Sequence, residues 1–92
     1  MADVIIINGI KPIKSEPYNS NNAWGFGGAR GTKYTYESGA VLFIGFAGSR
    51  HQGESRFHTV TDKNGTRQID RPGLRVDIHD PEIIKLITDG VL

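Results

Sequence analysis

The chain has 92 residues, a formal net charge of +1 and no cysteine. A chain of this length forms one domain with one hydrophobic core, so we expect a single domain over residues 1–92. The absence of cysteine excludes a disulfide framework and thiolate chemistry, and the near-neutral charge argues against a general polyanion binder. The longest apolar stretch, residues 40–48, is too short to span a bilayer, and residues 1–13 lack the basic segment of a signal peptide. We therefore expect a cytoplasmic protein.

The first predicted element is a hairpin near the N-terminus. Residues 4–7 and 10–13 are apolar, and Asn8-Gly9 between them suits a type I′ turn. Pro12 cannot donate to a ladder, so the returning arm is short or lies at an edge. Residues 14–31 are rich in Asn, Ser and Gly and show no periodicity, which predicts a long Gly/Asn-rich loop.

Two further hairpins follow. In the first, residues 33–37 alternate in character, Ser38-Gly39 turns the chain, and residues 40–46 are apolar on both faces, as in a central strand covered on both sides. Residues 56–70 predict the second, with its turn at residues 63–65. Residues 74–78 alternate apolar and charged side chains and predict one more strand.

The end of the chain predicts a helix. Asp80 is a suitable N-cap, Pro81 suits the first helical position, and Gly90 suits the position that follows the last turn. The apolar side chains between them form one stripe: Ile83, Ile84, Leu86 and Ile87. The expected fold is mainly β (α+β), with about six or seven short antiparallel strands in a curled sheet or small sandwich and one C-terminal helix near 81–89.

The segment from Gly25 to Gly31 contains four glycines and invites comparison with phosphate-binding loops. The Walker motif requires Lys and then Ser or Thr after the last glycine, whereas Gly31 is followed by Thr32-Lys33. The dinucleotide fingerprint requires a closer glycine spacing and a helix behind it, and a strand is predicted here. Both motifs are excluded. What remains is backbone access to an anion, with Arg30 and Lys33 supplying positive charge.

The candidate metal ligands or catalytic groups are three histidines and one glutamate: His51, Glu54, His58 and His79. No pair has the spacing of a zinc site, and the His58-to-Thr61 stretch lacks the second copy that a two-histidine phosphoesterase needs. Ser49 and Ser55 flank His51 without lying on a strand-to-helix elbow. We predict no metal, no cofactor and no enzymatic activity.

The charges divide unevenly along the chain, with a basic middle and an acidic tail. Residues 30–75 contain eight basic and four acidic side chains, whereas residues 77–92 contain one basic and four acidic side chains. Solvated strand faces would explain such a pattern. Arginines beside glycine-rich segments suit capture of phosphate or carboxylate, and aromatic rings suit stacking on a base. The predicted ligand-binding residues are Trp24, Phe26, Arg30, Lys33, Arg50, His51 and Arg56.

The preferred interpretation is a small non-enzymatic binding module. Its ligand is anionic: a nucleotide, a nucleic acid or an acidic face of a protein. Small chains with few motifs are typical of phage and mobile-element proteins, which include inhibitors of host machinery and virion parts. Burial of Trp24 and Phe26 in the core is the structural alternative for the two aromatic residues.

Two other functional classes stay open. The first is a structural, virion-type protein that assembles through its apolar ends, so we expect a homo-oligomer, with a dimer preferred. The second is a small metal-dependent hydrolase, which rests only on the histidines.

Overall fold

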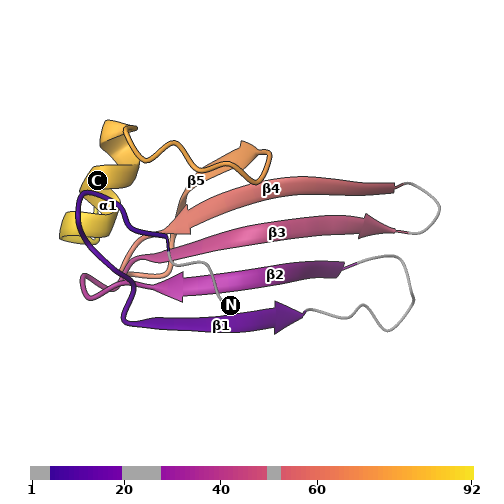
Figure 1. The fold of residues 1–92 in the computed structure, drawn as a ribbon, viewed down its shortest axis with the longest axis horizontal. Coiled ribbons are helices and arrows are strands. Elements are labelled where there is room, and N and C mark those ends of the chain that lie inside the picture. The colour runs from indigo at the N-terminus through magenta and orange to yellow at the C-terminus, as the bar shows by residue number, and fades with distance from the viewer. Residues whose placement is uncertain (1–4, 20–27, 50–52) are drawn as a thin grey trace.

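The computed structural model describes residues 5–19, 28–49 and 53–92. Five strands form one antiparallel sheet in chain order, and one helix packs against it (Figure 1). The elements are β1 (Lys14–Asn19), β2 (Gly28–Thr35), β3 (Val41–Ser49), β4 (Gly53–Thr61), β5 (Arg67–Pro72) and α1 (Pro81–Asp89). The mainly β class with a C-terminal helix agrees with the prediction. Within the described ranges the strands number five instead of six or seven, and they form one sheet and not a sandwich.

Of the predicted N-terminal hairpin, only the turn and one bridge form. Asn8 and Gly9 both have positive φ (53° and 75°), and Ile7 and Ile10 exchange two backbone hydrogen bonds around them. This matches the expected type I′ geometry, but in the described residues 5–13 the pairing stops at that single bridge. The arms are held by tertiary contacts instead, since Ile7 is fully buried and the carbonyl of Ile5 accepts a hydrogen bond from the Tyr36 hydroxyl.

The predicted long loop over residues 14–31 was wrong at both of its ends. Lys14–Asn19 forms β1, and β2 begins at Gly28, so the glycine-rich segment enters the sheet. Gly31 pairs with Gly45 of β3, and a Cβ on Gly31 would collide with the carbonyl oxygen of Ile44. Glycine here permits close approach of two strands and is not the mark of a loop.

The strand predicted at residues 74–78 is also absent. Gly73 adopts a positive φ of 89°, which turns the chain away from β5. Asp77 then starts a turn, because its carboxylate accepts from the backbone N–H of His79 at 3.0 Å. Of the alternating apolar residues only Val76 packs against the core, while Leu74 and Ile78 stay exposed.

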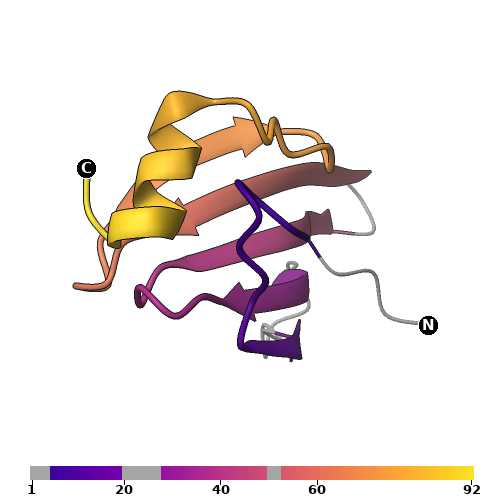
Figure 2. The ribbon, with the colours of Figure 1, turned by 60° about the vertical axis from the view of Figure 1, so that its left-hand side comes forward.

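The antiparallel register sorts the strand side chains onto two faces. One face, called the helix face, carries Tyr34, Leu42, Val60 and Ile69 as direct neighbours across β2 to β5. The buried residues of α1 complete this core: Ile83, Leu86 and Ile87. Figure 2 shows α1 and the segment of residues 5–13 on this same side of the sheet. The opposite face, called the outer face, carries Tyr18, Phe43 and Phe57, which explains why β3 is apolar in both directions.

Both ends of α1 are tied to the sheet. At its start the carboxylate of Asp80 caps the N–H of Glu82 at 2.9 Å and pairs with Arg71 of β5 at 2.7 Å. At its end Ser38 donates to the carbonyl of Ile87 at 2.8 Å, and Lys63 donates its N–H to the carbonyl of Gly90 at 2.8 Å. The helix therefore sits beside the β2–β3 and β4–β5 turns. The opposite end of the sheet, where β1 and β3 end and β2 and β4 begin, is called the distal end (Figure 1).

Candidate functional site

Three of the seven predicted ligand-binding residues lie on described strands. Arg30 and Lys33 belong to β2, and Arg56 belongs to β4. The other four lie outside the described residues: Trp24, Phe26, Arg50 and His51.

The two segments that contain these other four residues are flanked by strand ends that lie together. Asn19 and Gly28 border residues 20–27, and Ser49 and Gly53 border residues 50–52. The pairing of β2 with β3 joins these borders, since Gly28 is the partner of Gly48. The chain therefore enters and leaves both segments at the distal end, the end farthest from α1 (Figure 1).

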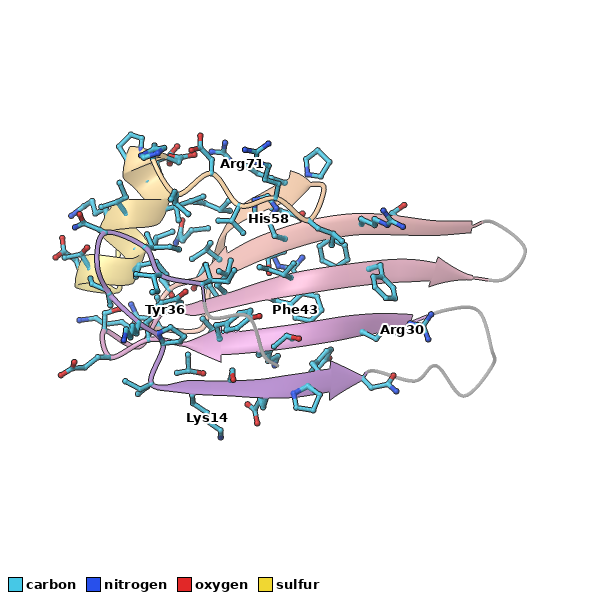
Figure 3. All side chains as sticks on the ribbon, viewed as in Figure 1. Lys14, Arg30, Tyr36, Phe43, His58 and Arg71 are labelled. Atoms are coloured by element: carbon cyan, nitrogen blue, oxygen red, sulfur yellow. The ribbon has the colours of Figure 1, made fainter. Side chains whose placement is uncertain are left out.

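Arg30 and Arg56 meet on the helix face at this distal end. Both are direct cross-strand partners of Phe46, which lies on the central strand β3 between them. The guanidinium of Arg30 lies over the Phe46 ring, 4.9 Å from its centroid. Both arginine side chains are exposed, whereas Phe46 is half-buried. Figure 3 shows Arg30 at the distal end of β2. We call these three residues the arginine row.

Lys33 lies on the other face of the sheet. Side chains alternate along a strand, so residues 30 and 33 of β2 point in opposite directions. The ammonium of Lys33 lies 4.3 Å from the centroid of the Tyr18 ring on β1. The structure therefore divides the three described residues of the predicted site between two surfaces.

A shallow hollow lies where β5 stops short of the distal end. Pro72, the last residue of β5, pairs with Phe57, so the described part of β4 beyond Phe57 has no strand neighbour on that side. The hollow has a volume of about 450 Å³. It is lined by Ser55, Arg56, Phe57, Arg67, Asp70 and Pro72. Among these residues only Arg56 was predicted as a ligand contact, because the others form a wall only once β4 and β5 are paired.

The histidines do not assemble a metal site in the described part of the chain. His58 is buried in β4, its Nδ1 lies 3.0 Å from the carbonyl oxygen of Gly73, and its Nε2 has no hydrogen-bond partner among the described residues. His79 is exposed in the turn before α1. Residues 5–19, 28–49 and 53–92 contain no group of three or more potential metal ligands. In this structure His58 is a core residue on the helix face.

The strands and the helix carry opposite net charges. The five strands contain six basic residues and three acidic ones. The helix and its N-cap contain three acidic residues and one basic one. Among the basic residues, Lys14 and Arg67 lie beside the β2–β3 and β4–β5 turns, whereas Arg30 and Arg56 lie toward the distal end.

Comparison of the chain with protein-family models, with curated proteins and with solved structures finds no match. No helix within the described ranges is long and apolar enough to cross a membrane.

Proposed function

We propose that the protein is a non-enzymatic binding module for an anionic ligand, held at the distal end of the sheet by the arginine row. The observation that carries this proposal is the position of Arg30 and Arg56 on either side of Phe46 on one face. Adjacent strands are about 4.8 Å apart, so the two arginine backbones are roughly 10 Å apart. Arginine side chains reach far enough to bring both guanidinium groups to one phosphate or carboxylate.

Phe46 contributes an apolar surface between the two charges. A guanidinium lying flat on a ring keeps its N–H groups directed outward at the edge, where they are able to donate to an anion. The Arg30 guanidinium lies over the Phe46 ring, 4.9 Å from its centroid. An anion that also carries an aromatic or apolar part therefore contacts both the guanidinium groups and the Phe46 ring.

A titration with four anionic probes tests the proposal: inorganic phosphate, ATP, a 12-nucleotide single-stranded DNA and a polyglutamate peptide. We expect at least one probe to bind with an affinity that falls as salt rises, because exposed charges are screened. The double variant Arg30→Gln/Arg56→Gln should lose most of this affinity. Its thermal stability should stay within a few degrees, because exposed charges contribute little to folding.

The matched control is Arg75→Gln/Lys85→Gln. It removes the same two charges from exposed positions near α1, and so it changes the net charge equally. Equal affinities of the two double variants, or no binding of any probe to the unaltered protein, would contradict the proposal.

Self-assembly is a second candidate function, favoured by the edge strand β1. Ile13, at the start of this edge, is 67% exposed, and Ile6 is 44% exposed. Unpaired strand edges with apolar residues are surfaces on which copies associate. Sedimentation equilibrium tests this: we expect a dimer that Ile13→Lys dissociates, and a species of only 10.1 kDa at high micromolar concentration would exclude it.

A further inference from the structure

The outer face of the sheet carries a cluster of three aromatic rings from three strands. Phe43 of β3 lies at its centre, 5.5 Å from Tyr18 of β1 and 5.6 Å from Phe57 of β4, measured between ring centroids. Phe43 is only 8% exposed, whereas Tyr18 and Phe57 are half-buried. The two outer rings thus present surface to solvent and are held in place by the central one.

Two glycines occupy the row between the outer rings and leave room for the Phe43 ring. Tyr18, Gly31, Gly45 and Phe57 are successive cross-strand neighbours in one row. The Phe43 ring folds over Gly45, where a Cβ would lie 2.8 Å from its Cζ atom. No helix or strand of residues 5–19, 28–49 and 53–92 packs over this face, because the helix lies on the other side of the sheet.

The charges on this face suit a phosphate backbone. The Lys33 ammonium lies over Tyr18, and in the described part of the chain no salt bridge joins it to a carboxylate, although Glu16 is its direct neighbour on β1. The carboxylates of Glu16 and Asp70 are each balanced by a cation at 3.5 Å, Lys14 and Arg67 respectively. These two pairs are neutral, so Lys33 leaves the described part of this face with a net positive charge.

The hollow beside Phe57 offers a place for a planar group. Phe57 and Pro72 form its apolar wall, the carboxylate of Asp70 can accept a hydrogen bond, and Arg67 can donate one. A nucleobase is planar, has N–H donors and ring acceptors at its edge, and is linked to a phosphate. The base plane matches the ring of Phe57, the groups at the base edge match the Asp70 carboxylate, and the phosphate matches Arg67.

We infer that the outer face binds the unpaired bases of a single-stranded nucleic acid, with Phe57 and Tyr18 as stacking surfaces and Lys33 and Arg67 as phosphate contacts. Aromatic side chains on a sheet, bordered by basic residues, stack bases with little preference for sequence. A duplex is a poor ligand because its bases are already stacked inside the helix. This inference concerns the face opposite the arginine row, of which only Arg56 also lines the hollow beside Phe57.

Fluorescence anisotropy with three labelled probes tests the inference: a 12-nucleotide single-stranded DNA, an abasic strand of the same length and charge, and a duplex of the same sequence. We expect the base-containing single strand to bind at least about tenfold more tightly than the abasic strand. Phe57→Ala should remove most of that difference, Phe57→Trp should keep it, and Leu74→Ala, an exposed apolar residue in the segment after β5, should not change it. If Phe57→Ala does not fold, the abasic comparison and Lys33→Gln, which should weaken binding of both strands, decide the question.

The outcomes separate this inference from the proposed function. Equal binding of the abasic and base-containing strands overturns the inference, even where the Arg30→Gln/Arg56→Gln variant abolishes binding. Base-dependent binding that this double variant leaves unchanged supports the inference and contradicts the proposed function. Failure of every nucleic-acid probe, with self-association that Phe57→Ala abolishes, assigns the face to a second copy of the chain and also overturns the inference.

Discussion

The carboxylate of Asp62 stabilises the turn between β4 and β5 by accepting hydrogen bonds. Its side chain accepts hydrogen bonds from the Gln68 amide and from the backbone N–H groups of Thr66 and Asn64, each at 2.9 Å. These donors favour the charged form, so they lower the pKa of Asp62 below its ordinary value, with the Gln68 amide as the largest cause. The stabilisation is therefore complete above the unfolded pKa and is lost as the pH falls through the folded pKa.

Replacement of Asp62 by Asn tests this role through pH. In the unaltered protein, the denaturant midpoint should begin to fall below about pH 4, where an unfolded aspartate takes up its proton. The Asp62→Asn variant should be less stable at pH 7 and should lose less stability between pH 7 and pH 2. The control, Asp89→Asn on the exposed side of α1, should follow the unaltered protein, whereas parallel curves for all three proteins would contradict the assignment.

Gly45 is a residue whose missing side chain shapes the outer face. A Cβ there would press on the Phe43 ring and on the carbonyl of Arg30. Gly45→Ala should therefore lower the free energy of unfolding by about 1–3 kcal/mol, the usual cost of overpacking. Denaturant titration measures this loss. Phe43→Leu in the same chain should recover part of it, and strict additivity of the two changes would show that the ring and the glycine are not coupled.

At the scale of the element, α1 depends on burial of its apolar stripe. Ile83, Leu86 and Ile87 are almost completely buried against the sheet, as the stripe in the sequence predicted, while Ile84 is half-buried. Ile87→Ala should cost about 2–5 kcal/mol, because it removes three buried carbons and leaves a cavity. The exposed neighbour Thr88→Ala serves as the control for helix propensity, and an unchanged denaturant midpoint for Ile87→Ala would contradict the packing described.

The predictable elements are those whose signals are local. The cap, the N-terminal proline and the terminal glycine of α1 act within the helix itself, so its bounds could be predicted. The β2–β3 and β4–β5 hairpins were predicted from their turns. By contrast, β1 is an edge strand that contains Pro17. It is held in an extended conformation by its pairing with β2, and no local sequence pattern predicts that pairing.

The site was predictable only in part, for a related reason. Arg30 and Arg56 were selected for their charge and glycine neighbours, but their common face follows from a register that only the paired strands define. The sequence predicts a loop over residues 28–31, and a loop would allow Lys33 to act together with Arg30. Once these residues are a strand, the odd spacing from Arg30 places Lys33 on the opposite face.

Across the whole molecule, the main core and the proposed anion site lie at different ends. The helix end holds most of the buried core and the acidic residues of α1, whereas the arginine row lies beyond it at the distal end. This arrangement leaves the proposed ligand contacts outside the main core. Changes to Arg30 and Arg56 should therefore affect binding far more than stability.

The dependence of binding on salt concentration tests the arginine row most directly. For single-stranded DNA, the logarithm of the binding constant falls with the logarithm of salt by about 0.7 per phosphate neutralised. Removal of two phosphate contacts in Arg30→Gln/Arg56→Gln should thus reduce the slope by about 1.4. The Arg75→Gln/Lys85→Gln control should keep the slope of the unaltered protein. Identical slopes for all three proteins would show that the arginine row does not contact the anion.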